Sequence, residues 1–409
     1  MTAADPAGVE SGRAGRPGTV REVLLASLQL GSTSFGGPIA HLGYFERAYV
    51  RQRQWLSGEE YASLVALCQI LAGPASSQVG LLIGLHRAGW LGGLAAWVGF
   101  TLPSALLMYA CAVAAARVQG PLAQAVVHGL KLVAVAVVAQ AVWSMARRLC
   151  PDRATAAIAL AAALLLLVAG GASMQLAALA AGAAAGAVLC RNTRVEAAPL
   201  PIPLPRAAAW SALALYGLLL VALPVLAALF PGGLIALAGI FYRAGALVFG
   251  GGHVVLPLLR DAMVPDGWIS DDSFLTGYGM AQAVPGPLFT LAAYLGAASR
   301  HIGAPAAGAA VALVSIFLPG LLIAVAGVSL WSRLARHASV RAGLAGINAA
   351  VVGFLGAALY DPVWVTAVHA GTDAAIAILG LALLERWRAP PVVVVVTCVA
   401  LSVAGVLFQ

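Results

Sequence analysis

Two glycine-rich stretches inside apolar segments have the residue types and spacing to bind a ligand. Residues 249–253 read Phe-Gly-Gly-Gly-His, and residues 35–38 read Phe-Gly-Gly-Pro. A glycine inside a helix costs ~1 kcal/mol relative to alanine, and in lipid a broken helix leaves backbone N–H and C=O groups without partners. We therefore expect each break to be buried in protein or to line a water-filled cavity. Two matching breaks, 214 positions apart, predict a substrate site built from two halves.

Gly73-Pro74 and Gly286-Pro287 form a second pair of interruptions in apolar segments. Proline lacks the backbone N–H and clashes with the preceding turn, so these segments must bend or unwind. A half-helix that ends in mid-membrane presents free N–H groups and about half a positive charge at its N-terminus. Facing ends of this kind would bind an anion without a formal counter-charge. The alternative is that Gly and Pro only permit tight packing between membrane helices, but their paired placement favours the anion site.

Polar side chains are few within the apolar segments, and most of them flank the four breaks. Gln69 and Gln282 each offer two amide donors, although they could instead join helices or satisfy freed backbone groups. His41 or His253 would couple proton movement to anion movement if it charges near neutral pH; the alternative is a neutral, hydrogen-bonding histidine. These side chains therefore complete the predicted anion site at the breaks.

Two charged residues, Lys131 and Arg243, stand inside apolar segments away from any expected loop. Charged groups within a membrane are functional candidates by default, although Lys131 could also extend to the interface. A cation beside helix N-termini would suit a small divalent oxyanion. The complete set of candidate substrate-binding residues is Phe35, Gly36, Gly37, Pro38, His41, Gln69, Gly73, Pro74, Ser76, Ser77, Gln78, Lys131, Arg243, Gly250, Gly251, Gly252, His253, Gln282, Gly286, Pro287 and Asn348.

The composition indicates a polytopic membrane protein. Of 409 residues, 62% are hydrophobic and 9% are charged, whereas soluble proteins carry about 25% charged residues. The net charge of +8 more readily sets membrane topology than binds nucleic acid. Five scattered cysteines argue against a disulfide framework or a zinc site, and we expect no metal or cofactor. Residues 1–20 lack the pattern of a cleavable signal and are expected to form a disordered cytoplasmic tail.

Thirteen apolar segments are long enough to be transmembrane helices, which need about 20 residues each. We expect an all-α protein with about 13 transmembrane helices, in which the glycine-broken segments either cross the membrane or re-enter. The expected helices are 22–45, 60–86, 90–116, 122–146, 154–171, 173–190, 208–230, 233–259, 273–299, 304–331, 340–360, 363–385 and 390–408. A proline-rich linker at 191–206 precedes the helix at 208–230.

The second half of the chain repeats the first. Trp55-Leu56-Ser57 matches Trp268-Ile269-Ser270, and Gly129-Leu130-Lys131 matches Gly346-Ile347-Asn348, while the glycine breaks match in the same order. The offset drifts only from 213 to 217, which indicates an internal duplication. The expected units are the tail 1–20, a first repeat 21–190, a linker with a spacer helix 191–231, and a second repeat 232–409.

The spacer helix predicts that the second repeat enters the membrane upside down. With the N-terminus in the cytoplasm and the C-terminus outside, sixteen arginines fall inside and five fall outside, as the positive-inside rule requires. A parallel arrangement would remove most of this bias. The five arginines expected outside are Arg47, Arg51, Arg53, Arg117 and Arg300.

No enzyme motif accompanies these features. The chain has no phosphate-binding Gly-x-x-x-x-Gly-Lys-Ser/Thr, no His-Glu-x-x-His and no nucleophile elbow. We therefore expect that the protein is not an enzyme and that any transport draws its energy from an ion gradient or from the gradient of the substrate.

The break motifs together resemble the chromate ion transporter family, in its long two-domain type. The resemblance is carried by residues 34–41, 53–56, 68–78, 249–257 and 281–287, and extends from about Arg21 to the C-terminus. It implies export of chromate, with sulfate as a tetrahedral mimic, driven by protons or the membrane potential and giving chromate resistance. It also implies a multi-pass protein of the bacterial inner membrane with duplicated halves of opposite orientation.

The residues alone leave several functions open. A sulfate or other oxyanion carrier and a passive anion channel would use the same breaks, and a membrane sensor or assembly factor would need a soluble domain that is not evident. The candidate partners are chromate or a sulfate-like anion, protons, the lipid bilayer and a second copy in a homodimer, with no nucleic acid.

Overall fold

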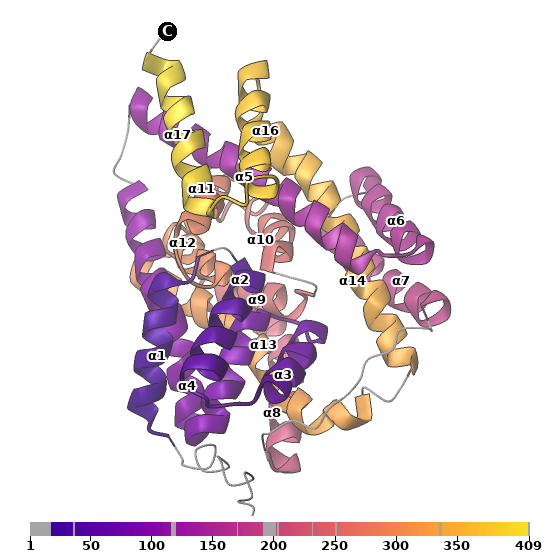
Figure 1. Cartoon of the computed structure of the whole chain (residues 1–409). Helices are drawn as coiled ribbons and strands as arrows, with labels where there is room; N and C mark the ends of the chain where they lie inside the picture. The colour runs from indigo at the N-terminus through magenta and orange to yellow at the C-terminus, as the bar shows by residue number, and fades with distance from the viewer. Residues whose placement is uncertain are drawn as a thin grey trace, which may run out of the picture.

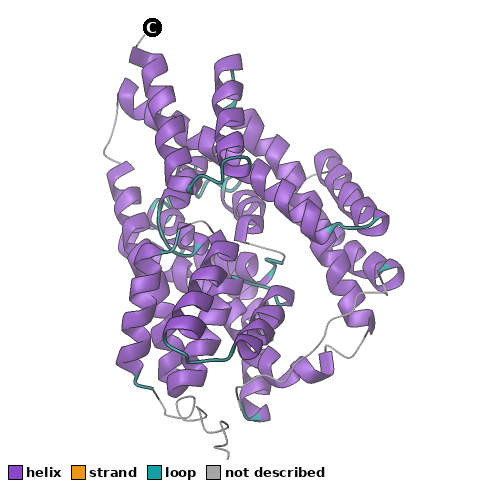
Figure 2. Ribbon diagram, viewed as in Figure 1, coloured by secondary structure: helices purple, strands orange, loops and turns teal. Residues whose placement is uncertain are grey.

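The computed structural model describes residues 18–35, 37–115, 120–169, 171–190, 202, 204–230, 232–249, 252–334 and 338–407. The regular structure in these ranges is helical, with no strand (Figures 1 and 2). Five helical stretches in them are long and apolar enough to cross a membrane: Ala75–Ala115, Gln124–Leu149, Arg206–Leu229, Pro305–Ser329 and Ala338–Ala367. The expectation of an all-α polytopic membrane protein is confirmed.

Each of the thirteen expected segments contains a helix. The first repeat holds α1 (Val20–Thr33), α2 (Gly37–Phe45), η1 (Glu46–Gln52), α3 (Gly58–Ile70), α4 (Ala75–Ala115), α5 (Pro121–Leu149), α6 (Arg153–Ala169) and α7 (Gly171–Leu189). The spacer is α8 (Arg206–Leu229). The second repeat holds α9 (Leu234–Ala246), η2 (Gly252–Val254), α10 (Val255–Met263), α11 (Asp271–Ala283), η3 (Leu288–Thr290), α12 (Leu291–Ala297), α13 (Pro305–Leu334), α14 (Ala338–Ala358), η4 (Leu359–Trp364), α15 (Val365–Ala367), α16 (Gly371–Glu385) and α17 (Pro391–Leu407).

Two boundaries differ from the expectation. The helix expected at 363–385 is interrupted: α15 ends at Ala367, and α16 begins at Gly371. Conversely, α4 joins parts of two expected helices across a kink at Ala88 and Gly89, where Gly89 has φ +65°. We call residues 75–87 the first part of α4 and residues 90–115 its second part.

The repeated Trp-x-Ser sequence marks equivalent helix starts in the two repeats. The Ser57 hydroxyl accepts a hydrogen bond from the Glu60 amide at 3.2 Å, and the Ser57 amide donates to the Glu60 carboxylate at 2.8 Å. The Ser270 hydroxyl accepts from the Ser273 amide at 3.3 Å. Side-chain oxygens at this position satisfy amides that a helix start leaves without partners. α3 and α11 therefore begin at matching positions for the same physical reason.

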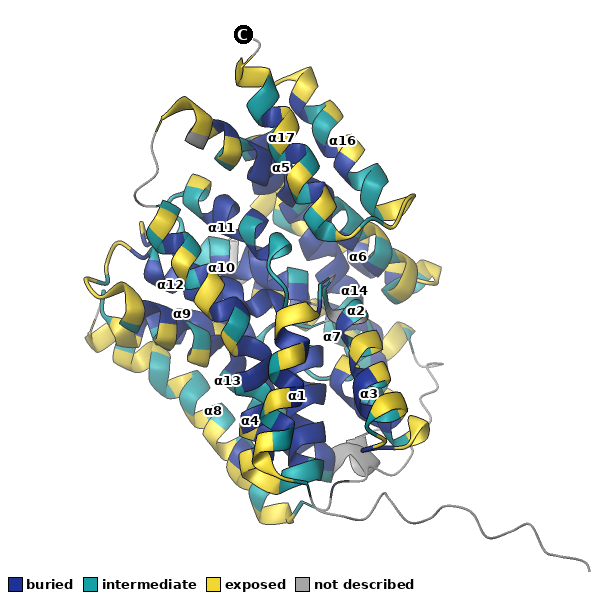
Figure 3. Cartoon of the chain, turned by 60° about the vertical axis from the view of Figure 1, so that its left-hand side comes forward, coloured by how far each residue is buried: buried dark blue, intermediate teal, exposed yellow. Residues whose placement is uncertain are grey.

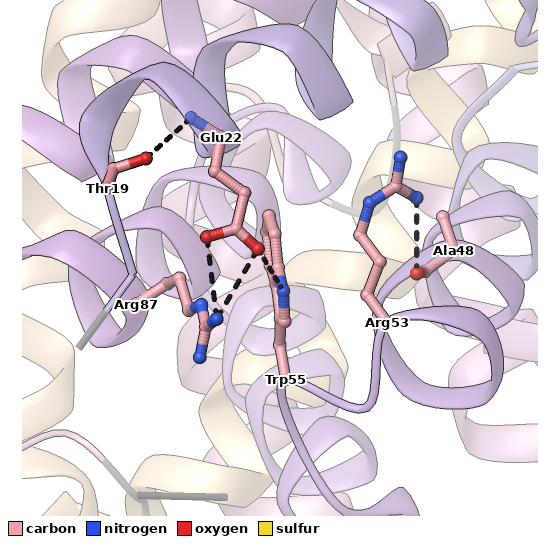
Figure 4. Close-up of polar contacts among 6 residues, drawn as sticks. All are labelled: Thr19, Glu22, Ala48, Arg53, Trp55 and Arg87. Carbon is pink, nitrogen blue, oxygen red and sulfur yellow. Dashed lines mark hydrogen bonds and ion pairs between the residues drawn. The ribbon is translucent and has the colours of Figure 1, made fainter. Parts of the chain in front are cut away.

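The broken helices of the first repeat fold back on themselves. Trp55, in the loop before α3, donates from Nε1 to the carboxylate of Glu22 at the start of α1, at 3.1 Å (Figure 4). Arg87, at the end of the first part of α4, contacts the same carboxylate at 3.4 Å and lies 5.3 Å from the Trp55 ring. The unit α1–α2–η1 and the unit formed by α3 and the first part of α4 thus each return to the end at which they start. Both are re-entrant hairpins.

These hairpins correct the side expected for one loop. A full crossing by residues 22–45 would place Arg47, Arg51 and Arg53 on the side opposite the N-terminus. The hairpin instead brings their loop back to the start of α1, and Arg53 donates to Gln29 in α1 at 3.2 Å. The three arginines therefore lie at the same end of the protein as Glu22.

The second repeat folds in the same way. The amide of Arg300, beyond the end of α12, donates to the carbonyl of Trp268 before α11 at 2.9 Å. Trp268 also packs against the His301 ring with centroids 4.7 Å apart. Trp268 and Arg300 are the counterparts of Trp55 and Arg87, so α11 and α12 form the matching hairpin, and α10 packs against α9.

The two repeats exchange their last helices. α6 and α7 of the first repeat pack on α14 of the second, while α16 and α17 of the second repeat pack on α5 of the first (Figure 1). Contacts that occur reciprocally are the signature of a two-fold relation. The spacer α8 packs on α9 and α13, and most of its surface is exposed (Figure 3). The expected pair of inverted repeats is confirmed.

Candidate functional site

The four helix breaks meet in two reciprocal pairs. The amide of Gly73 in the first repeat donates to the carbonyl of Val248 in the second at 2.7 Å, and the amide of Gly286 in the second donates to the carbonyl of Ser34 in the first at 2.8 Å. Each Gly-Pro break therefore bonds to the Phe-Gly-Gly break of the other repeat. Backbone groups that the breaks free from helices are satisfied across the repeat interface, which places the irregular backbone inside protein.

Glycine is required at both Gly-Pro breaks. Gly73 has φ +114° and Gly286 has φ +104°, a region that side chains strongly disfavour. A Cβ at Gly73 would lie 2.7 Å from the Cα of Gly320, and a Cβ at Gly286 would lie 2.6 Å from the Oγ of Ser104. Gly320 and Ser104 follow equivalent prolines in α13 and α4. The close approach of the breaks to these helices thus repeats in both halves.

Gln78 holds the first Gly-Pro break in shape. Its amide nitrogen donates to the carbonyl of Ala72 at 2.7 Å and to the carbonyl of Gly320 at 2.8 Å. The amide thus satisfies a carbonyl at the break and joins the break to α13. The structure favours the plain alternative for Gln78, a structural role, over direct contact with substrate.

A cavity of about 500 Å³ reaches the breaks from one side. Its walls come from α2, α3, the first part of α4, the C-terminal half of α5 and η2. It brings together the predicted residues Gly37, Gln69, Gly73, Gly252 and His253. The other lining residues are Ala40, Leu42, Cys68, Leu71, Ala75, Gln140, Ala141, Ser144, Met145, Arg148 and Leu149. We call this space the open cavity.

A second space of about 20 Å³ adjoins the same breaks. It is lined by Gly37, His253, Ala281, Gln282, Val284, Gly286, Leu288 and Pro391. Five of these residues, 281, 282, 284, 286 and 288, are the second-repeat counterparts of residues 68, 69, 71, 73 and 75 in the open cavity. We call it the closed pocket. Gly37 and His253 line both spaces, which therefore adjoin each other at these residues.

The two candidate histidines occupy different surroundings. His253 lies at the boundary of the two spaces, and its Nδ1 is 2.7 Å from the hydroxyl of Tyr278. His41 is completely buried, with its Nδ1 3.5 Å from the Ser76 hydroxyl and its ring 5.3 Å from the ring of Phe100. His253 thus lines both spaces that reach the breaks, whereas His41 lines neither.

Several buried polar atoms around the breaks have no hydrogen-bond partner among the described residues. Those nearest the breaks in sequence are Ser34 Oγ, His41 Nε2, Ser77 Oγ, Gln78 Oε1 and Gln282 Nε2. Leaving such a group without a partner costs about 1–3 kcal/mol, and native proteins rarely do so. The break region therefore offers donors and acceptors to a polar ligand or to water.

Three of the predicted site residues, two of them charged and one with an amide side chain, lie away from the two spaces at the breaks. Lys131 on α5 pairs with Asp272 at the start of α11. Arg243 on α9 is exposed and lies beside Gln175 of α7. Asn348 is half-buried on α14. None of the three lines the open cavity or the closed pocket.

The remaining candidates are placed as follows. Phe35 connects α1 to α2, Pro38 lies within α2, Pro74 directly precedes α4, and Pro287 directly precedes η3. Pro74 packs beside Gly320. Gly36, Gly250 and Gly251 lie outside the described residues.

The polar face of α5 is absent from the residues predicted from the sequence. Gln140, Ser144 and Arg148 recur every four residues, so they share one face of the helix, and all three line the open cavity. Arg148 stands at the end of an apolar segment, where an arginine is typical of a topology signal. The four-residue spacing of polar residues in an otherwise apolar helix is the signal that could have found them.

A helical membrane protein whose inverted repeats meet at interrupted half-helices has the architecture of a membrane transporter. The model of the family described as Chromate transporter matches residues 21–189 and again residues 235–403. The chain belongs to the chromate transporter family.

Relatives resemble the chain over most of its length. It is 28% identical to a chromate transport protein of Pseudomonas aeruginosa, over 92% of this chain and 90% of the relative. It is 27% identical to a probable chromate transport protein of Synechococcus elongatus, with 93% of each covered. It is 25% identical to a chromate transport protein of Cupriavidus metallidurans, with 90% and 89% covered. No solved structure matches the chain.

Proposed function

We propose that this protein is a secondary transporter that carries chromate, or a sulfate-like divalent oxyanion, through the site at the four helix breaks. The observation that carries the proposal is an open cavity at the breaks of the first repeat and a much smaller pocket lined by the equivalent residues of the second. A transporter must expose one site to the two sides in turn. The names of the relatives, chromate transport proteins, supply the substrate.

The break region suits a tetrahedral oxyanion. Ser76 and Ser77 begin the first part of α4, where helix N–H groups are free and the dipole favours negative charge. The amide of Gln69 and the ring of His253 line the cavity beside this helix start. Four oxygens of an anion would find hydrogen-bond donors from both repeats, as a site at a repeat interface requires.

Transport then follows from exchange of conformations between the repeats. The first-repeat hairpins take the arrangement of the second-repeat hairpins, which closes the open cavity and opens the closed pocket. The reciprocal bonds of Gly73 and Gly286 join equivalent points, so the exchange preserves the centre of the site while its access changes sides.

The distribution of the arginines supports placing the N-terminal side of the protein in the cytoplasm. The hairpins move Arg47, Arg51 and Arg53 to the N-terminal end and move Arg260 to the other end, so the bias toward the N-terminal side grows. By the positive-inside rule that side is the cytoplasm, and the C-terminus lies outside. The open cavity, lined by the C-terminal half of α5, then faces the cytoplasm. This orientation fits efflux, driven by a proton gradient or by the membrane potential, and hence chromate resistance in a bacterial plasma membrane.

Flux into vesicles that contain the purified protein tests this function. Chromate uptake should saturate with concentration, should be inhibited by sulfate, and should respond to an imposed proton gradient or membrane potential. Flux that rises linearly with concentration would replace the transporter by a passive anion channel. Saturable sulfate uptake that chromate does not inhibit would make the protein a sulfate carrier.

A further inference from the structure

α5 lines the open cavity with a row of polar side chains that runs from its mouth to the breaks. Gln140, Ser144 and Arg148 are one turn apart, which spans about 12 Å along the helix at 1.5 Å per residue. Gln140 lies toward the middle of α5, whereas Arg148 lies in the last turn. The row therefore connects the end of the helix with the depth at which Gly252 and His253 also line the cavity.

Arg148 dominates the charge of this cavity. It is the single lysine or arginine among the described lining residues, and none of those residues is aspartate or glutamate. A cleft lined by one sign of charge, with low-dielectric walls, concentrates counter-ions and speeds their entry. The guanidinium also presents a planar fork of donors that matches two oxygens of an oxyanion, which a lysine cannot reproduce. The open cavity is therefore adapted to collect anions.

The other repeat lacks this arrangement. At the offset of 217 that relates α5 to α14, the counterparts of Gln140, Ser144 and Arg148 are Ala357, Asp361 and Val365. An aliphatic residue replaces the arginine, and a carboxylate replaces the serine one turn earlier. When the counterpart cavity opens, its mouth would repel an anion that the first mouth attracts. The charges at the two mouths thus differ. They favour entry of the anion through the mouth of the open cavity and its departure through the other mouth.

We propose that Arg148 is the capture residue of the transporter, which binds a divalent tetrahedral oxyanion at the mouth of the open cavity and passes it along Ser144 and Gln140 to the breaks. This inference rests on the proposed function, because it assumes that the open cavity admits the substrate. It adds a specific contact between Arg148 and the anion, and it predicts that the anion enters from the side of the open cavity. Ser144 donates to the carbonyl of Ala141 at 3.1 Å, and would turn its hydroxyl toward the passing anion.

Binding of chromate and of sulfate to the purified full-length protein tests the role of Arg148. Arg148→Gln should raise the Kd for both anions about tenfold at low ionic strength, roughly 1.4 kcal/mol, and should flatten the salt dependence of Kd. Arg148→Lys should keep the salt dependence but bind more weakly than the wild type. The matched control is Arg147→Gln, which removes the same charge from the adjacent residue outside the cavity lining, and should bind like the wild type.

The outcomes separate this inference from the proposed function. If the wild type binds the anions and Arg148→Gln binds them equally well with unchanged salt dependence, the capture role is wrong and the transporter stands. The capture role is also wrong if Arg147→Gln weakens binding as much as Arg148→Gln. If the wild type binds neither chromate nor sulfate, both proposals fail. The salt dependence of Arg148→Lys, which keeps the charge, excludes a purely structural effect of the arginine.

Discussion

The two repeats place the same backbone in different surroundings. Gly73 and Gly286 have nearly equal φ angles, +114° and +104°, and their cross-repeat hydrogen bonds measure 2.7 and 2.8 Å. Yet the first-repeat break adjoins a cavity of about 500 Å³, and the equivalent residues of the second repeat adjoin a pocket of about 20 Å³. The difference between the repeats therefore lies in how the hairpins dock and not in how they fold.

The apolar cores show where the docking differs. In the second repeat, η2 and α10 pack on α14, and the hairpins share one large apolar cluster with α5 and α14. The first-repeat hairpins bury Val23, Phe45 and Leu64 in a second apolar cluster, which also includes Phe100 in the second part of α4 and Ala324 in α13. The open cavity lies between this cluster and α5. No described residue of α5 belongs to this cluster, so separation of the first-repeat hairpins from α5 does not divide an apolar core.

The largest expected effect comes from adding a methyl group at the two Gly-Pro breaks. Gly73→Ala and Gly286→Ala should each reduce chromate transport to less than about one-tenth, because a positive φ costs a side chain roughly 1–3 kcal/mol and a Cβ overlaps the neighbouring helix. Transport assays with membrane levels of each variant check this. Gly43→Ala is the matched control, since a Cβ there meets nothing within 4 Å, and it should transport normally.

The two variants also test the equivalence of the repeats. If the two breaks contribute equally to transport, Gly73→Ala and Gly286→Ala should lose similar fractions of the transport activity. Normal transport by Gly286→Ala beside an inactive Gly73→Ala would show that only the first-repeat break serves the site.

A smaller effect is expected for the accessibility of equivalent residues to a water-soluble reagent, which should differ between the two repeats. Leu71 lines the open cavity and Val284 lines the closed pocket. In a variant without native cysteines, Leu71→Cys should react with a charged, membrane-impermeant maleimide roughly tenfold faster than Val284→Cys, since a minor conformation is typically populated at about 10% or less. Rates measured with reagent on each side of vesicles check the prediction and the assigned orientation.

Equal labelling of the two cysteines from one side would contradict alternating access and would favour a continuous channel. If the repeats exchange conformations, conditions that slow Leu71→Cys labelling should speed Val284→Cys labelling on the opposite side. The pair thus measures whether the difference between the repeats is a permanent feature or one state of two.

The sequence predicts the breaks and the repeats, because Gly, Pro and apolar runs are local features. It leaves the re-entrant hairpins open, since a broken crossing helix and a hairpin have the same length and composition; the contact of Trp55 and Arg87 with Glu22 decides between them. It also misses partners that are distant in the chain. Lys131 pairs with Asp272, 141 residues away, and Gln78 bonds Gly320, 242 residues away, so neither role is visible in their own segments.

The smallest expected effect is on hairpin stability, when the N-cap side chains of the equivalent helices α3 and α11 are removed. Ser57 and Glu60 exchange two hydrogen bonds at the start of α3, whereas Ser270 receives one bond at the start of α11, because Ser273 replaces the glutamate. Ser57→Ala and Ser270→Ala should each lower the stability of their hairpins by about 1 kcal/mol, because each removes one side-chain acceptor for an amide in the first turn. Glu60→Ala should remove the additional bond, donated by the Ser57 amide, that α11 lacks. Hydrogen exchange at the first turn of each helix measures both, with Glu60→Gln as a control that keeps the side-chain oxygen. A larger loss at Ser270 would mean that the second-repeat hairpin depends on its cap more than the first-repeat hairpin does.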